Sequence, residues 1–275
     1  MTVDLDPPVS VIIPTYNGAP YLREALDSIT NQTFRDFEAI IIDDVSSDNT
    51  VEIAREYAAK DSRLRVFQNE ANLGFAGNRN KAVMLARGRY IAWLDQDDIA
   101  MPERLELQYR LLESDERLGL VGGAMAVFNE KGQVRVRHYP TEDAEIREMI
   151  FRFSPIALPA CMMRKNVFLG VGGYSLRWSP AGDLDMTFKI GLSHRLGNVG
   201  QVVVRYRSHQ NSATTRHLRR IERDSIRIRF GYAMSGVYRM TPLDFLYNIT
   251  HYMSIWIIPP KLKIWLFNKV RDAAA

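Results

Sequence analysis

Short apolar runs alternate with amphipathic stretches over the first hundred residues, and this alternation limits the possible folds more than any other feature. The short apolar runs cover 9–14, 37–43, 64–68 and 90–95. Apolar residues recur at helical spacing over 21–32, 50–60 and 77–88. Strands that alternate with helices in this way form a parallel sheet with crossover helices. The sequence therefore predicts an α/β fold with a mostly parallel sheet flanked by helices.

Each predicted strand is followed by a polar, turn-rich segment. These segments are "PTYNG" (14–18), "DDVSSDNT" (43–50), "NEANLGFAGNRN" (69–80) and "DQDD" (95–98). Ligands of open α/β sheets bind beyond the carboxyl ends of the strands. Four such segments at successive strand ends predict one binding cleft.

The pattern loosens after residue 98. Helical spacing covers 102–114 and 142–153, and strand-like alternation covers 133–139 and 201–209. A second acidic segment, "GDLD" at 182–185, precedes the last of these strands. We see no internal repeat and no interdomain linker.

The composition indicates a globular protein without internal disulfide bonds. The chain has 275 residues, and 46% hydrophobic with 25% charged residues is typical of a globular protein. The single Cys161 excludes an internal disulfide framework. The N-terminal segment lacks a basic region followed by an apolar one, so we expect no signal peptide and a cytoplasmic start.

The C-terminal part has its own electrostatic character. Residues 1–204 hold 23 Lys and Arg against 28 Asp and Glu, whereas residues 205–275 hold 13 against 4. Such asymmetry indicates an anionic partner for the C-terminal part, either a phospholipid surface, a phosphorylated acceptor or nucleic acid.

Five segments together resemble a known family. They are "VSVIIPTYNGAPYLREALDSITNQTF", "IIIDDVSSDNT", "NLGFAGNRNKA", "GRYIAWLDQDDIAMPERLE" and "GDLDMTFKI". In order and spacing they closely resemble glycosyltransferase family 2, over roughly Val9 to His209. The resemblance implies a Rossmann-like GT-A fold and an inverting hexosyltransferase-type enzyme that uses a nucleotide-sugar, by default a UDP-sugar. It predicts a catalytic domain over 1–210, with a nucleotide-sugar half at about 9–98 and an acceptor half at about 99–210.

The resemblance also implies a donor site at the strand ends. Tyr16 would offer its ring to the nucleobase, Asp44 would accept the imino N–H of the base, and Asp95 would lie near the ribose. The alternative interpretation of Tyr16 is a half-buried aromatic residue in a turn. The alternative interpretation of Arg79 is a solvated arginine in the first turn of a helix. The predicted donor-binding residues are Pro14, Thr15, Tyr16, Asn17, Asp44, Arg79, Asp95 and Gln96.

"DQDD" resembles the D-x-D motif of the family. On this basis Asp97 would hold a divalent cation that bridges the two donor phosphates, and His209 would complete the metal shell. Oxygen ligands suit Mn²⁺ or Mg²⁺. His209 is open to a second interpretation as a core or surface histidine, and Asp98 is expected to be a helix-capping or loop carboxylate.

Transfer with inversion needs a general base on the acceptor side. The resemblance assigns Asp183, in a family element usually written Glu-Asp; here Gly182 replaces the Glu. Asp185 is the alternative candidate for the base. The alternative role of Asp183 is to cap the helix that follows it. Trp178 is expected either to stack on an acceptor sugar or to pack in the core.

Two other functions compete with this interpretation. An acidic residue after the second strand, Asp43 or Asp44, is typical of an NAD-dependent oxidoreductase, but the first strand is followed by "TYNGAPYL" and not by G-x-G-x-x-G. A non-catalytic nucleic-acid-binding module would use the arginine-rich stretch at 205–229. It would leave the four strand-end segments without a role, and we expect no nucleic acid partner.

The C-terminal residues 211–275 predict a helical segment that associates with a membrane or a partner. Asp244, Asn248, His251 and the prolines interrupt any run of roughly 20 apolar residues, so a membrane-spanning helix is not expected. Apolar faces flanked by Lys261, Lys263, Lys269 and Arg271 suit the headgroup region of an anionic leaflet. This predicts a peripheral protein on the inner face of the plasma membrane, with a lipid-linked or glycan acceptor. The alternative is packing on the catalytic domain or on a second protomer.

Overall fold

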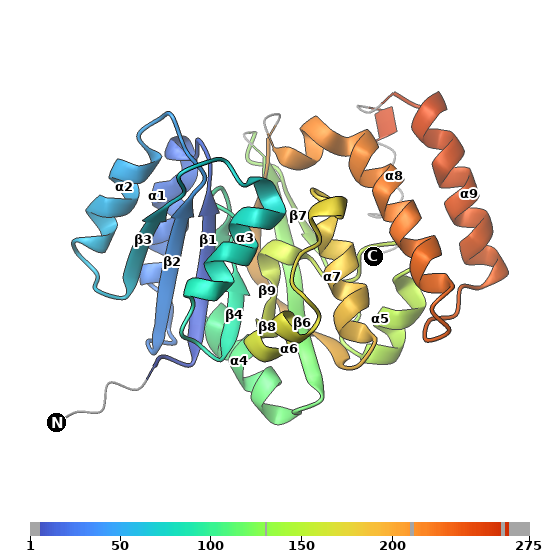
Figure 1. The fold of residues 1–275 in the computed structure, drawn as a ribbon, viewed down its shortest axis with the longest axis horizontal. Coiled ribbons are helices and arrows are strands. Elements are labelled where there is room, and N and C mark those ends of the chain that lie inside the picture. The colour runs from blue at the N-terminus through green and yellow to red at the C-terminus, as the bar shows by residue number, and fades with distance from the viewer. Residues whose placement is uncertain (1–5, 130, 210–211, 260–261, 264–275) are drawn as a thin grey trace.

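Figure 1 shows a computed structural model of the chain, in which the described residues are 6–129, 131–209, 212–259 and 262–263. The strands are β1 Val9–Thr15, β2 Phe37–Asp43, β3 Leu64–Gln68, β4 Tyr90–Trp93, β5 Ile99–Ala100, β6 Leu118–Asn129, β7 Val134–Arg137, β8 Met162–Arg164 and β9 Arg195–Ser208. The α-helices are α1 Ala19–Thr30, α2 Thr50–Ala58, α3 Gly74–Leu85, α4 Arg104–Ser114, α5 Asp143–Met149, α6 Lys165–Gly170, α7 Gly182–Gly191, α8 Ala213–Ala233 and α9 Pro242–Ile257. Two short 3₁₀ helices cover Leu158–Ala160 and Leu176–Trp178.

One sheet runs through the molecule in the order β3-β2-β1-β4-β8-β6-β9-β5, and β7 pairs with β6 (Figure 1). The first four strands are parallel to one another. β8 then pairs antiparallel with β4 and β6, and β5 pairs antiparallel with β9, whereas β6 and β9 are parallel. The predicted α/β architecture with helices on both faces is confirmed; the N-terminal half of the sheet is all parallel, and the C-terminal half is mixed.

Helices cover both faces of the sheet, so the central strands are buried on both sides. Val9, Val11 and Ile13 of β1 pack with α1, α2 and α4 in one apolar cluster. Ile12 of the same strand packs with α3, α6 and α7 in the other. Successive side chains of a strand point to opposite faces, and burial of both faces explains why the sequence shows mostly apolar runs there instead of alternation.

The helix α8 packs on the catalytic part through α7. The Tyr232 ring stacks on Phe188 with 4.6 Å between ring centroids, and the Tyr232 hydroxyl donates to Asp185 Oδ1 at 3.0 Å. Ile228 and Tyr238 extend the same apolar cluster. The boundary expected at residue 210 stays a prediction.

The helix α9 contacts the rest of the chain through two buried polar side chains, the buried Ile255 and ring contacts of Phe245 and Tyr247. Arg152 Nε donates to Asp244 Oδ1 at 2.5 Å, and Asn248 Nδ2 donates to the Phe151 carbonyl at 2.8 Å. Thr241 and Asp244 form a capping box that fixes the first turn. No helix within the described ranges is long and apolar enough to span a membrane. Lys261, Lys269 and Arg271, named above for the membrane face, lie outside the described residues.

Candidate functional site

A cleft of about 640 Å³ opens at the carboxyl ends of β1, β2 and β4. Its lining contains all eight predicted donor residues and both predicted metal ligands: Pro14, Thr15, Tyr16, Asn17, Asp44, Arg79, Asp95, Gln96, Asp97 and His209. The structure thus brings residues from five separate chain segments to one place.

Gln96 ties the fourth strand end to the first. The Tyr16 backbone N–H donates to Gln96 Oε1 at 2.9 Å, and Gln96 Nε2 donates to the Tyr16 carbonyl at 3.0 Å. The Tyr16 side chain itself is 51% exposed. Its backbone is therefore fixed while its ring offers a free aromatic surface in the cleft.

Asp44 organises the loop before α3. One carboxylate oxygen accepts from Asn69 Nδ2 and the Leu73 N–H, and the other accepts from the Gly74 N–H, each at 2.8 Å. Gly74 has φ +68°, which a residue without a side chain adopts without strain. A carboxylate accepts about four hydrogen bonds, so one acceptor position of Asp44 stays open to a ligand N–H.

Two non-glycine residues with positive φ flank this site. Asn17 has φ 49° and Val45 has φ 68°. A β-branched residue in this region is strained, and such strain gathers at ligand sites. Ser46 and Ser47 hold the Asn17 turn, because the Asn17 N–H donates to Ser46 Oγ and the Ser47 N–H donates to Asn17 Oδ1, each at 2.8 Å.

The three carboxylates of "DQDD" have different partners. Arg79 NH2 donates to Asp95 Oδ1 at 2.5 Å, and the His209 Nε2 and Asp97 Oδ2 atoms are 2.8 Å apart. Asp98 is fully buried and accepts from the Arg207 N–H of β9 at 2.9 Å. Asp98 is therefore a loop carboxylate that joins the D-x-D segment to β9.

Burial and mutual repulsion oppose the charged forms of these carboxyl groups. Burial raises the pKa of Asp95; Arg79 opposes this and Asp97 adds to it. Burial raises the pKa of Asp98 well above its ordinary range, and the charges of Asp97 and Asp95 add to the rise. The acidic loop is thus costly by itself and favours a cation close by.

A buried arginine, Arg104, places a positive charge beneath the acidic loop that follows β4. Arg104 is fully buried, and its NH2 donates to the carbonyls of Trp93 at 2.5 Å and Cys161 at 3.2 Å. Burial lowers the Arg104 pKa to about 10, and the charges of Asp98 and Asp95 oppose this fall. The side chain therefore stays charged at neutral pH. Arg104 supports the loop after β4 and does not line the cleft.

The Asp97–His209 pair fits a divalent cation. Two atoms that bind one Mg²⁺ in neighbouring positions lie about 3 Å apart. The separation of 2.8 Å between Asp97 Oδ2 and His209 Nε2 is close to this value. Within the described chain no group of three His, Cys, Asp or Glu side chains is placed to hold a metal. A two-residue site matches an ion that takes its other ligands from substrate phosphates and water.

Asp183 and Asp185 lie in the first turn of α7 in different surroundings. Asp185 is 3% exposed, accepts from the Tyr232 hydroxyl and lies 3.1 Å from Lys189 Nζ. Asp183 is half-buried, and its Oδ1 has no hydrogen-bond partner among the described residues. Burial raises the Asp183 pKa to about 7; Arg79 opposes the rise and Asp95 adds to it. A carboxyl group poised near neutral pH and without a structural partner suits a general base.

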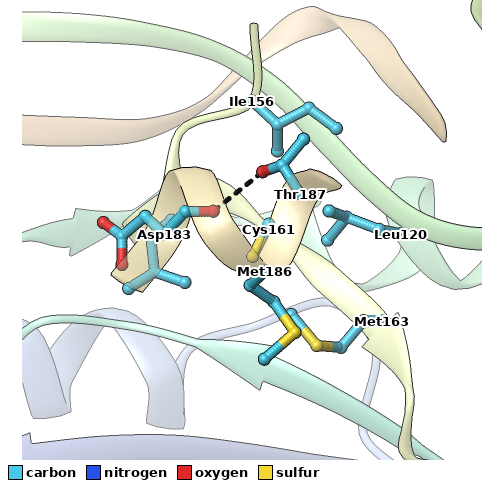
Figure 2. Close-up of a pocket in the computed structure, with 8 residues that line it drawn as sticks. Leu120, Ile156, Cys161, Met163, Asp183, Met186 and Thr187 are labelled. Atoms are coloured by element: carbon cyan, nitrogen blue, oxygen red, sulfur yellow. Dashed lines mark hydrogen bonds between the residues drawn. The ribbon is translucent and has the colours of Figure 1, made fainter. Parts of the chain in front are cut away.

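Asp183 borders a separate cavity of about 10 Å³ that Figure 2 shows. The cavity is lined mainly by apolar side chains such as Ile156, Met163 and Met186. In Figure 2 the Asp183 carboxylate points away from them, and only its backbone carbonyl accepts from Thr187 Oγ1, at 2.9 Å. The cavity is a small packing defect of the core.

The acceptor side has Gly182 beside the Tyr174 ring. A Cβ at Gly182 would lie 3.0 Å from Tyr174 Cδ1, so a side chain at this position requires the ring to shift slightly. Trp178 is half-buried against the cluster around Phe188, with the Arg177 guanidinium 4.6 Å from its ring centroid. Trp178 does not line the cleft.

Sequence reasoning missed a further group of cleft residues. They are Pro20, Tyr21, Asn72, Gly74, Phe75, Asn78, Ser179, Pro180, Tyr206, Ser212, Arg216, His217 and Arg220. Several of them fall in the polar segment 69–80, which already predicted a ligand site. The residues on α8 had no such signal, because nothing in the sequence indicates that α8 begins beside the cleft.

Comparison with known proteins identifies the family. The model for "Glycosyl transferase family 2" matches residues 10–170. The chain belongs to glycosyltransferase family 2. An uncharacterized glycosyltransferase of Methanocaldococcus jannaschii is 38% identical over 172 residues, covering 61% of this chain and 59% of the relative. The putative glycosyltransferase EpsE of Bacillus subtilis is 36% identical over 169 residues, covering 61% and 60%.

Solved structures share the fold of this family 2 chain. S. aureus TarS 1–349 in complex with UDP-GlcNAc has a TM-score of 0.66 at 20% identity, covering 90% of this chain and 72% of TarS. The mannosyltransferase PcManGT of Pyrobaculum calidifontis, in complex with GDP-Man and Mn²⁺, has a TM-score of 0.63 at 19% identity, covering 94% and 73%. The expected GT-A fold is confirmed. The chain spans about 60% of the length of the first two curated relatives.

Proposed function

We propose that this chain transfers a sugar from a nucleoside diphosphate sugar, by preference a UDP-sugar, to a hydroxyl acceptor with inversion. The observation that carries the proposal is the cleft in which the Asp97–His209 pair, Tyr16 and the open position of Asp44 meet. TarS was solved with UDP and with UDP-GlcNAc, and this supports a uridine donor. The names EpsE and TuaG, the latter for teichuronic acid biosynthesis, support a role in bacterial glycan synthesis.

In this proposal one set of residues binds the donor, and Asp183 acts on the acceptor. In this proposal Tyr16 stacks on the base, Asp44 accepts its imino N–H, and Asp97 with His209 holds Mn²⁺ or Mg²⁺. The ion would stabilise negative charge that develops on the diphosphate as the anomeric C–O bond breaks. Asp183 takes the proton of the acceptor hydroxyl as its oxygen bonds to the anomeric carbon. The electron pair of the broken bond goes to the β-phosphate oxygen.

The two competing functions lack such support. An NAD-dependent oxidoreductase would need a glycine-rich phosphate loop after β1, and the family 2 match covers this part of the chain. For a nucleic-acid module we find no observation that favours it, because six residues of the arginine-rich stretch at 205–229 line the proposed nucleotide cleft.

A nucleotide screen tests the proposal. We expect UDP to bind in the presence of Mn²⁺ more tightly than ADP, since adenine has no imino N–H for Asp44 to accept. Guanine does carry an imino N–H, so the expected preference for UDP over GDP rests on the uridine nucleotides bound to TarS. Isothermal titration calorimetry with the three nucleotides, each with and without EDTA, measures this. Binding of none of them would contradict the proposal, and tighter binding of GDP would replace uridine with guanosine.

We also propose that the protein docks on an anionic membrane through α9. Two polar residues of this helix, Asp244 and Asn248, face the protein together with Ile255, and most of its apolar residues are exposed. The apolar residues exposed to at least 39% are Leu243, Phe245, Leu246, Ile249, Tyr252, Met253, Trp256 and Ile257. The helix lies at the outer rim of the molecule, at the opposite end from β3 (Figure 1).

Such a face matches an interfacial amphipathic helix. Contiguous exposed apolar surface of this extent marks a membrane or protein contact, and the excess of basic residues in 205–275 favours an anionic leaflet. Docking there would bring the acceptor side to a lipid-linked substrate on the cytoplasmic leaflet. Packing of α9 on a second protomer is the competing outcome.

Vesicle flotation tests the docking. We expect the full chain to float with phosphatidylglycerol vesicles and the double variant Phe245→Glu/Trp256→Glu to stay at the bottom. Each fully buried apolar side chain contributes about 1.5–3 kcal/mol, so the two changes lower partitioning by roughly 10²-fold or more. Met84→Glu is the control, because Met84 is 69% exposed on α3, outside this face. Equal flotation of parent and double variant, or none by the parent, would contradict the docking; a concentration-dependent dimer that the double variant loses would favour the second protomer.

A further inference from the structure

The cleft has few cations free to bind a diphosphate. Asp44, Asp95 and Asp97 line its floor, and Arg79 pairs with Asp95 at 2.5 Å while its guanidinium lies 3.7 Å from the Phe75 ring centroid. Arg79 is therefore already neutralised and fixed. One divalent ion beside three carboxylates leaves the diphosphate in a site with little excess positive charge, so further cations are needed.

The first turns of α8 supply such cations at the cleft wall. Arg216, His217 and Arg220 are lining residues of the cleft. Arg216 and Arg220 are four positions apart, so they lie on the same helix face. His217 has non-helical dihedrals, φ −115° and ψ 18°, which bend the helix at this point. The helix enters the site from the C-terminal part of the chain, next to the segment that bears His209.

These arginines are not held by strong ion pairs. Arg216 forms no ion pair with any residue that the structure describes. Arg220 Nε lies 3.7 Å from Asp224 Oδ2, and that carboxylate is shared with Arg223 and Arg227. One buried carboxylate faces three guanidinium groups, so the positive charge of this surface is not cancelled.

We infer that Arg216 and Arg220 bind the diphosphate of the donor and of the released nucleotide. The inference rests on the proposed nucleotide-sugar function and adds a second, protein-borne source of positive charge to it. When the anomeric C–O bond breaks, its electron pair goes to the β-phosphate oxygen, and guanidinium groups stabilise that charge through charge-assisted hydrogen bonds. In this inference the arginine-rich stretch at 205–229, which a nucleic-acid-binding module would use for nucleic acid, binds a nucleotide instead.

Nucleotide and nucleoside titrations separate this role from a general effect on the cleft. We expect Arg216→Ala and Arg220→Ala each to weaken UDP binding about five- to tenfold, because each loses a charge-assisted contact at a partly exposed site. Uridine lacks phosphates, so its affinity is expected to stay at the parent value. Calorimetry in Mn²⁺ and again in EDTA measures both, and the loss should persist in EDTA since the arginines act independently of the metal.

Arg219→Ala is the matched control, because Arg219 is exposed on the same helix and does not line the cleft. Unchanged UDP affinity in both lining variants, or equal losses in all three variants, would overturn the inference. Parallel losses for UDP and uridine would also overturn it, because they indicate a structural change of the base site. A parent protein that binds none of UDP, GDP and ADP would instead overturn the proposed function, and this inference with it.

Discussion

Replacing Asp183 by asparagine is expected to lower the turnover of sugar transfer by about 10²–10⁴-fold while UDP affinity stays near that of the parent protein. Only the capacity to take the acceptor proton is lost, because asparagine has nearly the same size. Asp183 Oδ1 has no hydrogen-bond partner among the described residues, so the fold does not depend on the charge. Parallel measurement of UDP affinity by calorimetry and of turnover with the donor sugar separates binding from chemistry.

The pH dependence gives a second readout of the same group. Burial raises the Asp183 pKa to about 7, with Arg79 opposing the rise and Asp95 adding to it. The base works in its deprotonated form, so kcat/KM is expected to be level above pH 7 and to fall tenfold per pH unit well below it. The acid limb should disappear in the residual activity of Asp183→Asn.

Asp185→Asn is the control for this assignment. Asp185 lies two residues away, but the Tyr232 hydroxyl and Lys189 already occupy its carboxylate. We expect this variant to lose thermal stability and to keep most of its turnover once folded. Loss of turnover in Asp185→Asn together with full turnover in Asp183→Asn would assign the base to Asp185 instead.

The sequence predicted the parallel half of the fold well because local and tertiary requirements agree there. β1 and β2 are buried on both faces, so each appears as a mostly apolar run, interrupted only by Ser10 and Glu38, and the polar segments begin where the strand leaves the core. The carboxyl ends of parallel strands must meet at one edge, so the four polar segments predicted one shared cleft. The family resemblance named the individual residues, and the lining residues on α8 were missed.

Local patterns were less informative where a distant segment decides the role of a residue. Helical spacing was predicted to continue to residue 88, yet α3 ends at Leu85, and a Cβ at Gly88 would lie 2.6 Å from the Ser10 backbone nitrogen. The glycine is required by close approach of β1. Asp98 similarly depends on Arg207, which is 109 residues away. The placement of Arg216 and Arg220 follows from the packing of α8 on α7, and no local pattern indicates that contact.

Asp97→Ala is expected to abolish the stimulation of UDP binding and of transfer by Mn²⁺. The variant keeps only His209 of the two-residue pair, and a Lewis acid at the leaving diphosphate contributes several kcal/mol, so transfer should fall by roughly 10²–10³-fold. Titration of UDP against parent and variant, with Mn²⁺ or with EDTA, measures the metal-dependent part directly. The affinity of the variant should equal that of the parent protein in EDTA, because both then rely on the base contacts and on the arginines of α8.

Asp98→Asn provides the matched control for the loss of one carboxylate from the same loop. In the parent protein the Arg207 N–H donates to Asp98 Oδ1 at 2.9 Å. The amide oxygen of asparagine can still accept this hydrogen bond, so the loop should stay attached to β9. Asp98→Asn is therefore expected to keep the Mn²⁺ dependence that Asp97→Ala loses. The opposite order, with Asp98→Asn insensitive to Mn²⁺ and Asp97→Ala responsive, would move the metal from the Asp97–His209 pair to the buried carboxylate. Equal UDP binding by the parent protein with Mn²⁺ and with EDTA would remove the metal from the mechanism, and the cleft would then depend on its arginines alone to neutralise the diphosphate.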